Sequence, residues 1–465
     1  MTSTDNAIDA LRTNFGGVVL AADDAGFDDA RRAWNAGVDR RPAAIARCSS
    51  TADVVAALGY ARERGLEVSV RGGAHNASGL AIAEGGVMID LSGLAHIDVD
   101  PQARRARVGG GALLGAVDAA TAEHGLAVPF GAISHTGVGG LTLGGGMGWL
   151  SRKFGLSVDN LESAEVVLAD GRVVRASADA YPDLFWALRG GGGNFGVVTE
   201  FEFRLHPVDP MVELGFFFWS LDQGPAALRL ARDVAATLAP ELNVIVGAIN
   251  APPEPFVPQE YRFAPGYVLL LAGFDGTPAH AEAVARIRAE LPPTFDMVTP
   301  MPYVALQQML DEGNAWGFHA YIKATYVDDL SDGVIDVLTD RFPRKSSPMS
   351  VVLMYRLDGA FSQVPEDDTA FGGGRSPRFA VFVVGFAPSP ELIAADRTWV
   401  RDTIDGLRPF AIGDGSGYVN DLVEVHDDDR VRATYGAAKY DRLTQIKGVY
   451  DPGNVFHLNA NIKPS

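Results

Sequence analysis

Apolar positions between Arg41 and Pro207 alternate between helical and strand spacing, which predicts a mixed unit of helices and strands. The segment Ser50-Thr51-Ala52-Asp53 has the form of a capping box, and apolar residues then recur at helical spacing up to Gly65. A hairpin turn is predicted at 169–172, in Ala-Asp-Gly-Arg. Further strands are predicted at 67–71, 87–91, 106–108, 164–168, 173–174 and 197–203, and further helices at 112–123 and 182–189.

After Pro207 longer elements alternate and predict a second α+β unit over 208–410. Proline clusters at 252–258 and 292–302 predict loops. The small polar segment that follows a last helix is expected to return to the first unit, so we expect domains at 1–207 (core at about 41–207), 208–410 and 411–465. The elements after Pro207 are predicted as strands at 212–219, 267–273, 351–355 and 379–386, and helices at 224–238, 278–291, 390–407 and 436–450.

Composition places the chain among globular proteins, because 465 residues with 47% hydrophobic and 21% charged side chains suffice for two cores. A formal net charge of −19 without a basic patch argues against nucleic acid as a partner. The single cysteine, Cys48, excludes an internal disulfide and a cysteine metal cluster, and the nine histidines show no metal-ligand spacing. With no signal-peptide pattern and no apolar run of about eighteen residues, we expect a cytoplasmic protein that does not bind membranes.

Three glycine clusters carry the candidate chemistry. They lie at 71–76 (Arg-Gly-Gly-Ala-His-Asn), at 137–148 and at 190–196. Because glycine has no Cβ, backbone N–H groups in such loops approach a large anionic ligand closely. The first loop follows a predicted strand and carries one imidazole, His75. The conjunction of three clusters in one unit favours a large bound ligand over isolated turns.

The third cluster also matches the dinucleotide fingerprint Gly-x-Gly-x-x-Gly at Gly191, Gly193 and Gly196. That fingerprint binds a pyrophosphate where a strand precedes it and a helix follows. Here a predicted helix at 182–189 precedes it and a predicted strand at 197–203 follows, so we exclude a Rossmann NAD site. A trough of glycine loops and strand ends is expected instead, and it suits an extended dinucleotide.

The order of these motifs resembles the berberine-bridge-enzyme-like flavoprotein oxidases of the vanillyl-alcohol-oxidase superfamily. The resemblance rests on Arg-Gly-Gly-x-His at 71–75, on Gly-Val-Gly-Gly-x-x-x-Gly-Gly-Gly-x-Gly-x-x-x-Arg-Lys-x-Gly at 137–155, and on Arg-Gly-Gly-Gly-Gly-Asn-Phe-Gly at 189–196. Near the C-terminus, Tyr418-Val419-Asn420 and the segment 450–456 look like the closing signature of the family. The resemblance covers the chain from about Arg41, and within the family the chain looks most similar to bacterial biosynthetic oxidases.

This resemblance implies an α+β fold with a PCMH-type FAD-binding domain of two subdomains, split between about 41–207 and 411–465. An α+β substrate domain with an antiparallel sheet would cover the flavin. The resemblance also implies an 8α-histidyl bond from His75 to FAD, which raises the reduction potential of the flavin. The residues expected to bind FAD are Arg71, Gly72, Gly73, Ala74, His75, Asn76, Gly79, His135, Thr136, Gly137, Gly139, Gly140, Gly144, Gly145, Gly148, Asn160, Gly193, Gly196, Val197, Val198, Tyr418 and Asn420.

Three positions near the second glycine cluster refine this expectation. Many members of the family attach the flavin a second time through a cysteine, and this chain has Ile133 at that position, so we expect a covalent bond through His75 only. The family position that controls access of O2 is Thr136, whose small hydroxyl leaves room for O2 and favours an oxidase over a dehydrogenase. His135 either lies beside the flavin or only braces the loop.

The catalytic base stays open between several side chains. Plant relatives have a tyrosine where this chain has Asp421, directly after Tyr-x-Asn. Tyr418 either assists deprotonation or lines the pocket, and a phenol base needs a neighbouring positive or flavin charge to lower its pKa from ~10. Lys323 is a candidate for that role, as are Tyr355 and Arg356 on the following strand, although each can instead face water.

Together these observations predict an FAD-dependent oxidase. A hydride leaves a carbon that bears a hydroxyl or an amine in a small organic or natural-product substrate or in a sugar. A base takes the proton, and O2 reoxidises the flavin to give H2O2. Two alternatives stay open: a flavin-N5-oxide monooxygenase of secondary metabolism, and a non-catalytic flavoprotein that binds a ligand. We expect the substrate in a cleft between the domains, no metal, and a monomer or homodimer.

Overall fold

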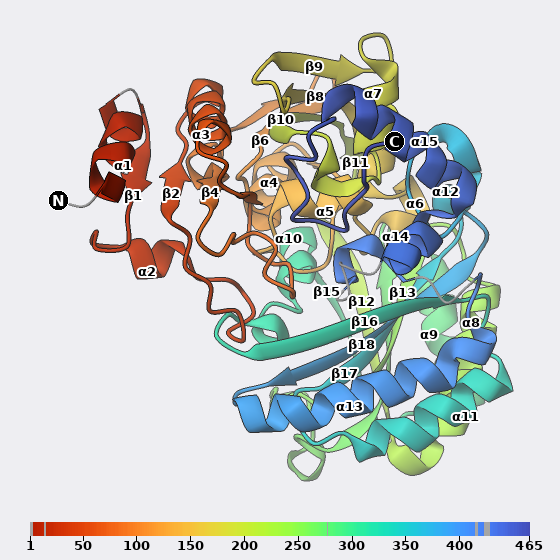
Figure 1. Ribbon diagram of the computed structural model, residues 1–465. Helices are drawn as coiled ribbons and strands as arrows, with labels where there is room; N and C mark the ends of the chain where they lie inside the picture. Colours follow the sequence, from red (N-terminus) through yellow and green to blue (C-terminus); the bar gives the residue numbers. More distant parts are fainter. Residues whose placement is uncertain (1–2, 14, 277, 414–416, 423–427) are drawn as a thin grey trace.

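Two larger β-sheets and one two-stranded sheet lie in the chain up to Pro207 (Figure 1). The structure is a computed structural model that describes residues 3–13, 15–276, 278–413, 417–422 and 428–465. One sheet has the order β1-β2-β4-β3 with β2, β4 and β3 parallel, and the other is antiparallel with the order β5-β6-β10-β8-β9. Their strands are β1 (Val18–Leu20), β2 (Ala44–Arg47), β3 (Val68–Arg71), β4 (Val87–Asp90), β5 (Ile97–Asp100), β6 (Arg105–Gly109), β8 (Leu161–Val167), β9 (Val173–Ser177) and β10 (Val197–Arg204), and β7 (Leu126–Ala127) pairs separately with β11 (His206–Pro207).

Helix α3 begins at the predicted capping box and covers the four-stranded sheet. Ser50 Oγ accepts the N–H of Asp53 at 3.2 Å, and the Asp53 carboxylate accepts the N–H of Ser50 at 3.1 Å. Val54 and Leu58 are fully buried against the strands, as their spacing predicted. The helices of this part are α1 (Ser3–Thr13), α2 (Phe27–Ala30), α3 (Thr51–Glu63), α4 (Leu114–Ala122), α5 (Val138–Gly144), α6 (Ser151–Phe154) and α7 (Pro182–Leu188).

A seven-stranded antiparallel sheet forms the centre of residues 208–410, in the order β15-β12-β14-β13-β17-β18-β16. One face packs on helices α8, α9, α11 and α13, of which α11 and α13 run along the lower side of Figure 1. The other face meets the first part of the chain, where Trp149 and Leu150 pack with Phe216 and Phe218. The elements are β12 (Met211–Ser220), α8 (Gly224–Ala236), β13 (Leu242–Asn250), β14 (Pro265–Gly273), α9 (Pro278–Glu290), β15 (Phe295–Pro302), α10 (Tyr303–Gln308), β16 (His319–Val327), α11 (Asp332–Arg341), β17 (Val351–Leu357), α12 (Ala360–Gln363), β18 (Arg378–Ala387) and α13 (Pro390–Leu407).

Strand β15 corrects the prediction of a loop at 292–302. It pairs antiparallel with β12 although it contains Pro300 and Pro302. Because β15 is an edge strand, one side of its backbone has no neighbouring strand to bond, and proline is tolerated there. Strand β13, which the pattern did not predict, lies inside the sheet with both faces covered, so its residues are apolar without alternation.

The C-terminal segment lies against the first 207 residues, where α15 packs on α7 (Figure 1). Lys447 and Asp451 form a fully buried ion pair at 2.6 Å. The Lys447 ammonium also donates to the carbonyls of Asn194 at 2.7 Å and Phe456 at 3.2 Å, so each of its N–H bonds has an acceptor, as burial of a charge requires. The helices of this segment are α14 (Asp428–Tyr435) and α15 (Ala437–Tyr450).

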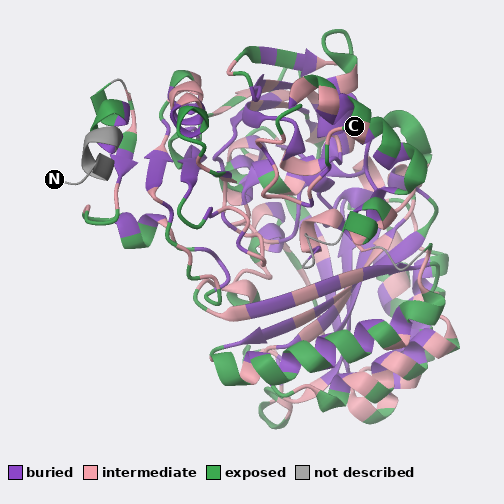
Figure 2. Cartoon of the chain, in the orientation of Figure 1, coloured by how far each residue is buried: buried purple, intermediate pink, exposed green. Residues whose placement is uncertain are grey.

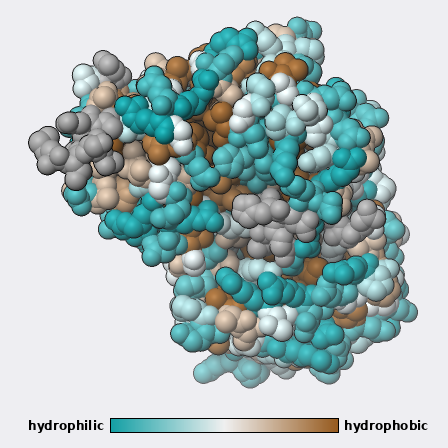
Figure 3. Space-filling model, viewed as in Figure 1, coloured by the Kyte–Doolittle hydropathy of each residue, from teal (hydrophilic) through white to brown (hydrophobic). Residues whose placement is uncertain are grey.

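Burial follows these layers. Figure 2 shows the seven-stranded sheet mostly buried, whereas α11 and α13 alternate buried and exposed positions along their length. The face of the molecule in Figure 3 is mostly hydrophilic. Among the described helices, none combines the length and the apolar character needed to cross a bilayer.

Candidate active site

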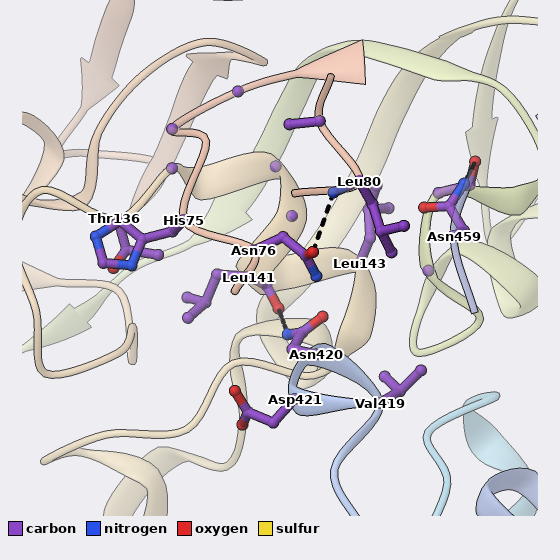
Figure 4. Close-up of a pocket in the computed structure, with 18 of the residues that line it drawn as sticks. His75, Asn76, Leu80, Thr136, Leu141, Leu143, Val419, Asn420, Asp421 and Asn459 are labelled. Atoms are coloured by element: carbon purple, nitrogen blue, oxygen red, sulfur yellow. Dashed lines mark hydrogen bonds between the residues drawn. The ribbon is translucent and has the colours of Figure 1, made fainter. Parts of the chain in front are cut away.

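A cavity of about 360 Å³ is lined by the glycine loops and by the seven-stranded sheet, and Figure 4 shows part of this lining. Stretches that are far apart in the sequence meet there. They are the turn after β3, the start of α5 with the residues before it, residues 192–198, the C-terminal segments 418–422 and 456–460, and one face of β16, β17 and β18. The three glycine clusters therefore border one space.

The turn after β3 presents its backbone to this cavity. The N–H groups of residues 72–76 donate no hydrogen bond to any residue that the structure describes. Ala74 adopts a left-handed conformation with φ of +52°, and its carbonyl accepts the N–H of Trp34 at 3.0 Å. Backbone donors away from water normally have a partner. A run of free N–H groups at a cavity is therefore suited to bind an anionic group such as a pyrophosphate.

Two glycine loops meet backbone to backbone beside this turn. A Cβ on Gly73 would lie 2.2 Å from the nitrogen of Gly137, and a Cβ on Gly137 would lie 2.2 Å from the nitrogen of Gly73. Gly144 is constrained in the same way, because its Cβ would lie 2.1 Å from Asn420 Oδ1. Glycine is needed at these positions for close approach of the loops.

We expect Gly73→Ala to lower the free energy of unfolding and to displace the loop that carries His75. Overpacking costs about 1–3 kcal/mol or more, and the facing atoms here are backbone atoms that have no rotamer to change. Thermal denaturation and the flavin content of purified protein measure the effect. Gly59→Ala is the control, because Gly59 lies inside α3 and its Cβ would have no atom within 4 Å. Wild-type Tm and flavin content in Gly73→Ala would contradict the argument.

Three other rings, those of Trp34, His135 and Trp316, lie around His75. Trp34 stacks on its imidazole with 4.9 Å between ring centroids and 18° between planes. Nε2 of His75 and Nδ1 of His135 are 2.7 Å apart, whereas Nδ1 of His75 bonds no described residue. Burial, with a smaller contribution from His135, lowers the pKa of His75 to about 3. The imidazole is therefore neutral near pH 7.

Most of the residues expected to bind a cofactor line the cavity. In Figure 4 His75 lies beside Thr136, at the opposite end of the drawn residues from Asn459. Asn459 donates to the carbonyl of Gly193 at 3.1 Å and so joins the C-terminal segment to the third glycine cluster. The expected residues that line the cavity are Gly72, Gly73, Ala74, His75, Asn76, Thr136, Gly137, Gly139, Gly140, Gly193, Gly196, Val197, Val198, Tyr418 and Asn420.

The other expected residues do not line the cavity. Arg71 donates from its guanidinium to the carbonyl of Ala30 at 3.0 Å, and Asn160 donates from its amide to the carbonyl of Phe154 at 2.9 Å. His135 reaches the site only through its contact with His75. This second group comprises Arg71, Gly79, His135, Gly144, Gly145, Gly148 and Asn160.

Lys323, a candidate for the site, does not line the cavity. On β16 it is Ile322 that lines the cavity. Alternate residues of a strand point to opposite faces, so Lys323 lies with Tyr321 on the face that α13 covers. Arg356 does not line the cavity either, and pairs with Asp358 at 2.7 Å. Neither cation is among the groups that shift the pKa of Tyr355 or Tyr418.

Tyr418 joins the C-terminal segment to the second glycine cluster. Its hydroxyl oxygen accepts the N–H of Gly146 and a side-chain N–H of Asn420, each at 2.8 Å. Burial raises the pKa of Tyr418, and these two donors offset the rise only in part. Tyr355 also lines the cavity, and burial and the nearby Asp421 raise its pKa as well. Both phenols therefore stay protonated near neutral pH.

Asp421 is a site residue that the sequence flagged only as a departure from the plant pattern. It lines the cavity, and its carboxylate bonds no described residue. Burial raises its pKa to about 7. Figure 4 shows Asp421 and Val419 pointing to opposite sides of one segment. A carboxyl group that titrates near the working pH is suited to accept a proton from a substrate.

Trp34 is a second residue that sequence reasoning missed. Its indole N–H donates to the carbonyl of Asn314 at 2.6 Å while its ring stacks on His75. A lone tryptophan in the N-terminal segment carries no local signal of this contact. At the family's cysteine position Ile133 lines the cavity, and Cys48 is fully buried in the cluster under α3. In the described chain no group of three or more His, Cys, Asp or Glu is arranged to hold a metal ion.

Comparison with known proteins agrees with this geometry. Residues 42–177 match the FAD binding domain family, and residues 411–463 match the berberine and berberine-like family. The (R)-6-hydroxynicotine oxidase of Paenarthrobacter nicotinovorans is 32% identical over 467 residues, which cover 96% of this chain and 97% of the relative.

Solved structures extend the likeness to the whole fold. The 6-hydroxy-D-nicotine oxidase of Arthrobacter nicotinovorans superposes with a TM-score of 0.85 at 28% identity, covering 97% of this chain and 99% of its own. The glucooligosaccharide oxidase of Acremonium strictum, which contains a 6-S-cysteinyl, 8α-N1-histidyl FAD, superposes with a TM-score of 0.84 at 25% identity over 100% of both chains. The α+β fold of PCMH type is thereby confirmed. With its matching motifs, its fold and a relative alike along nearly its whole length, the chain belongs to the berberine-bridge-enzyme-like FAD-linked oxidoreductases.

Proposed function

We propose that this FAD-dependent oxidoreductase is an oxidase that removes a hydride from a C–OH or C–N carbon of a small organic molecule and passes electrons to O2, giving H2O2. The observation that carries the proposal is the convergence of free backbone N–H groups, neutral His75 and Asp421 on one cavity. Bound FAD supplies the hydride acceptor. The named oxidase relatives support the reaction class.

The glycine loops and the sheet line different parts of the cavity, and we assign them different ligands. We propose that residues 1–207 and 411–465 bind FAD through the glycine loops, and that 208–410 bind the substrate through the sheet. Thr136, beside His75 in Figure 4, has a small side chain that leaves room for O2. The cytoplasmic location and the monomeric or homodimeric state stay predictions.

The surroundings of His75 support a covalent bond through Nδ1. In the tautomer with hydrogen on Nε2, that hydrogen points to His135 Nδ1 and leaves a lone pair on His75 Nδ1. The lowered pKa keeps this lone pair free near pH 7. With Ile133 at the cavity and Cys48 buried elsewhere, we propose attachment to the protein through His75 alone.

We expect His135→Ala to slow covalent incorporation of FAD by about 10²-fold or more, because His135 would take the Nε2 proton as His75 forms its new bond. Apoprotein incubated with FAD, sampled over time for flavin that stays with acid-precipitated protein, gives the rate. Added imidazole should restore part of that rate. His124→Ala, an exposed histidine, is the control. Incorporation at the wild-type rate in His135→Ala would show that His135 only braces the loop.

Asp421 is the group best placed to take the substrate proton. Its pKa near 7 leaves much of it ionised at neutral pH, whereas the raised pKa values of Tyr418 and Tyr355 keep those phenols protonated. Tyr418 holds the C-terminal segment through Gly146 and thereby positions Asp421 at the cavity. The proton moves from the substrate heteroatom to a carboxylate oxygen of Asp421.

Anaerobic mixing with a panel of alcohols, amines and sugars tests the proposed function. Bleaching of the flavin absorbance by one compound, its return on admission of O2 and formation of H2O2 are expected. Label from ¹⁸O2 in the organic product would favour the monooxygenase alternative. A flavin that no compound bleaches would favour a ligand-binding protein.

A further inference from the structure

Three neighbouring strands give the cavity an apolar wall. Ile322 of β16 pairs with Val384 of β18, and Leu353 of β17 pairs with Phe382 of β18. Directly paired residues share a face of a sheet, and all four line the cavity together with Tyr355. We call these five residues the sheet wall. Its one polar atom is the hydroxyl oxygen of Tyr355, whose ring meets Phe382 edge to face at 5.5 Å.

Charged side chains are scarce around the cavity. Among the described residues that line it, Asp421 is the only Asp, Glu, Lys or Arg. His75 is neutral because burial lowers its pKa. A carboxylate that bonds no described residue in such surroundings is stabilised by a cation and destabilised by an anion. The free N–H groups of 72–76, by contrast, belong to the glycine loops and not to the sheet wall.

These features discriminate between classes of substrate. A sugar needs a hydrogen-bond partner for each buried hydroxyl, and the sheet wall offers one oxygen. A carboxylate or phosphate would meet Asp421 with no cationic side chain among the described lining residues. An apolar ring can pack against the side chains of the sheet wall, and an ammonium group can form an ion pair with the Asp421 carboxylate.

We propose that the substrate is an amine with an apolar ring, which rests on the sheet wall with its nitrogen at Asp421. The inference rests on the proposed function and specifies its substrate. The ammonium N–H proton passes to the Asp421 carboxylate, and the neutral amine then loses a hydride from the carbon beside nitrogen to FAD. The products are an iminium ion and FAD reduced by two electrons, and water hydrolyses the iminium to a carbonyl compound and an amine or ammonia.

Binding of matched probes to the FAD-loaded protein tests this assignment. Benzylamine, benzyl alcohol and benzoate share a ring and differ in charge, and cellobiose represents sugars. At about pH 8 benzylamine is largely an ammonium ion. Titrations followed by calorimetry and by flavin difference spectra should rank benzylamine about tenfold or more tighter than benzyl alcohol, with benzoate weakest. In Asp421→Asn, which keeps the shape of the side chain, benzylamine should bind within about twofold of benzyl alcohol.

The proposal is overturned if benzoate or cellobiose binds more tightly than benzylamine, or if benzylamine has no advantage over benzyl alcohol. An unchanged preference in Asp421→Asn also overturns it. The same samples separate this outcome from failure of the proposed function. Bleaching of the flavin by cellobiose or benzyl alcohol, reversed by O2, would retain the oxidase and reject the amine. Absence of flavin absorbance from the purified protein would reject the oxidase itself.

Discussion

His75→Ala should abolish covalent flavin. In acid-precipitated wild-type protein we expect the yellow colour in the pellet and an intact mass increased by one FAD. The variant should give a colourless pellet and the mass of the polypeptide alone, because the neutral Nδ1 of His75 is the nucleophile that we propose for the bond. Some FAD should still bind without the bond, since the free N–H groups of residues 72–76 do not depend on the imidazole.

His124→Ala is the matched control, because His124 is exposed and does not line the cavity. It should keep both the yellow pellet and the added mass. Wild-type protein that releases all its flavin on acid precipitation would contradict the covalent bond while leaving the FAD site. A yellow pellet from His75→Ala would place the bond on another residue.

Asp421→Asn should lower the rate constant for flavin reduction by about 10²–10⁴-fold, the usual contribution of a positioned general base. The substrate is the compound that bleaches the flavin fastest under anaerobic conditions, and stopped-flow absorbance measures the rate. The amide has nearly the same shape as the carboxyl group, so the walls of the cavity keep their geometry. FAD content and Tm should therefore stay close to the wild-type values.

The pH profile separates a base from a residue that only shapes the cavity. A base acts in its deprotonated form, so the wild-type rate should rise with pH through the raised pKa of Asp421, at about 7. Asp421→Asn should lose this rise, whereas Asp179→Asn, at an exposed carboxylate, should retain it. An unchanged profile in Asp421→Asn would show that another group takes the proton, and Tyr418 would then be the next residue to change.

Local rules explain why much of this fold was predictable. The capping box at Ser50 and the period of α3 depend on residues within a few positions of one another, and both are as predicted. The prediction of a loop at 292–302 failed because the tolerance of proline in β15 depends on its place at the edge of a sheet. That place is decided by strands distant in the sequence.

Lys323 and Ile322 are neighbours in the sequence, yet only Ile322 lines the cavity. The local sequence could not predict which of the two would do so. The alternation of residues along the chain predicts a strand with two different faces. Which face meets the cavity depends on whether α13 or the glycine loops cover it. The raised pKa of Asp421 has a similar origin, because burial by distant segments causes it. No local motif encodes that desolvation.

The sequence by itself was sufficient to predict the three glycine loops, His75 within the first of them, and the family. Loops whose backbones approach closely need glycine at fixed positions, so the spacing of the glycines identifies them. Tertiary structure decided the surroundings of that histidine, where Trp34 stacks on His75 and His135 bonds its Nε2. It also brought Asp421 and the apolar sheet wall to the same cavity. Spacing along the chain carries backbone requirements, whereas burial and charge arise only when distant segments enclose a common space.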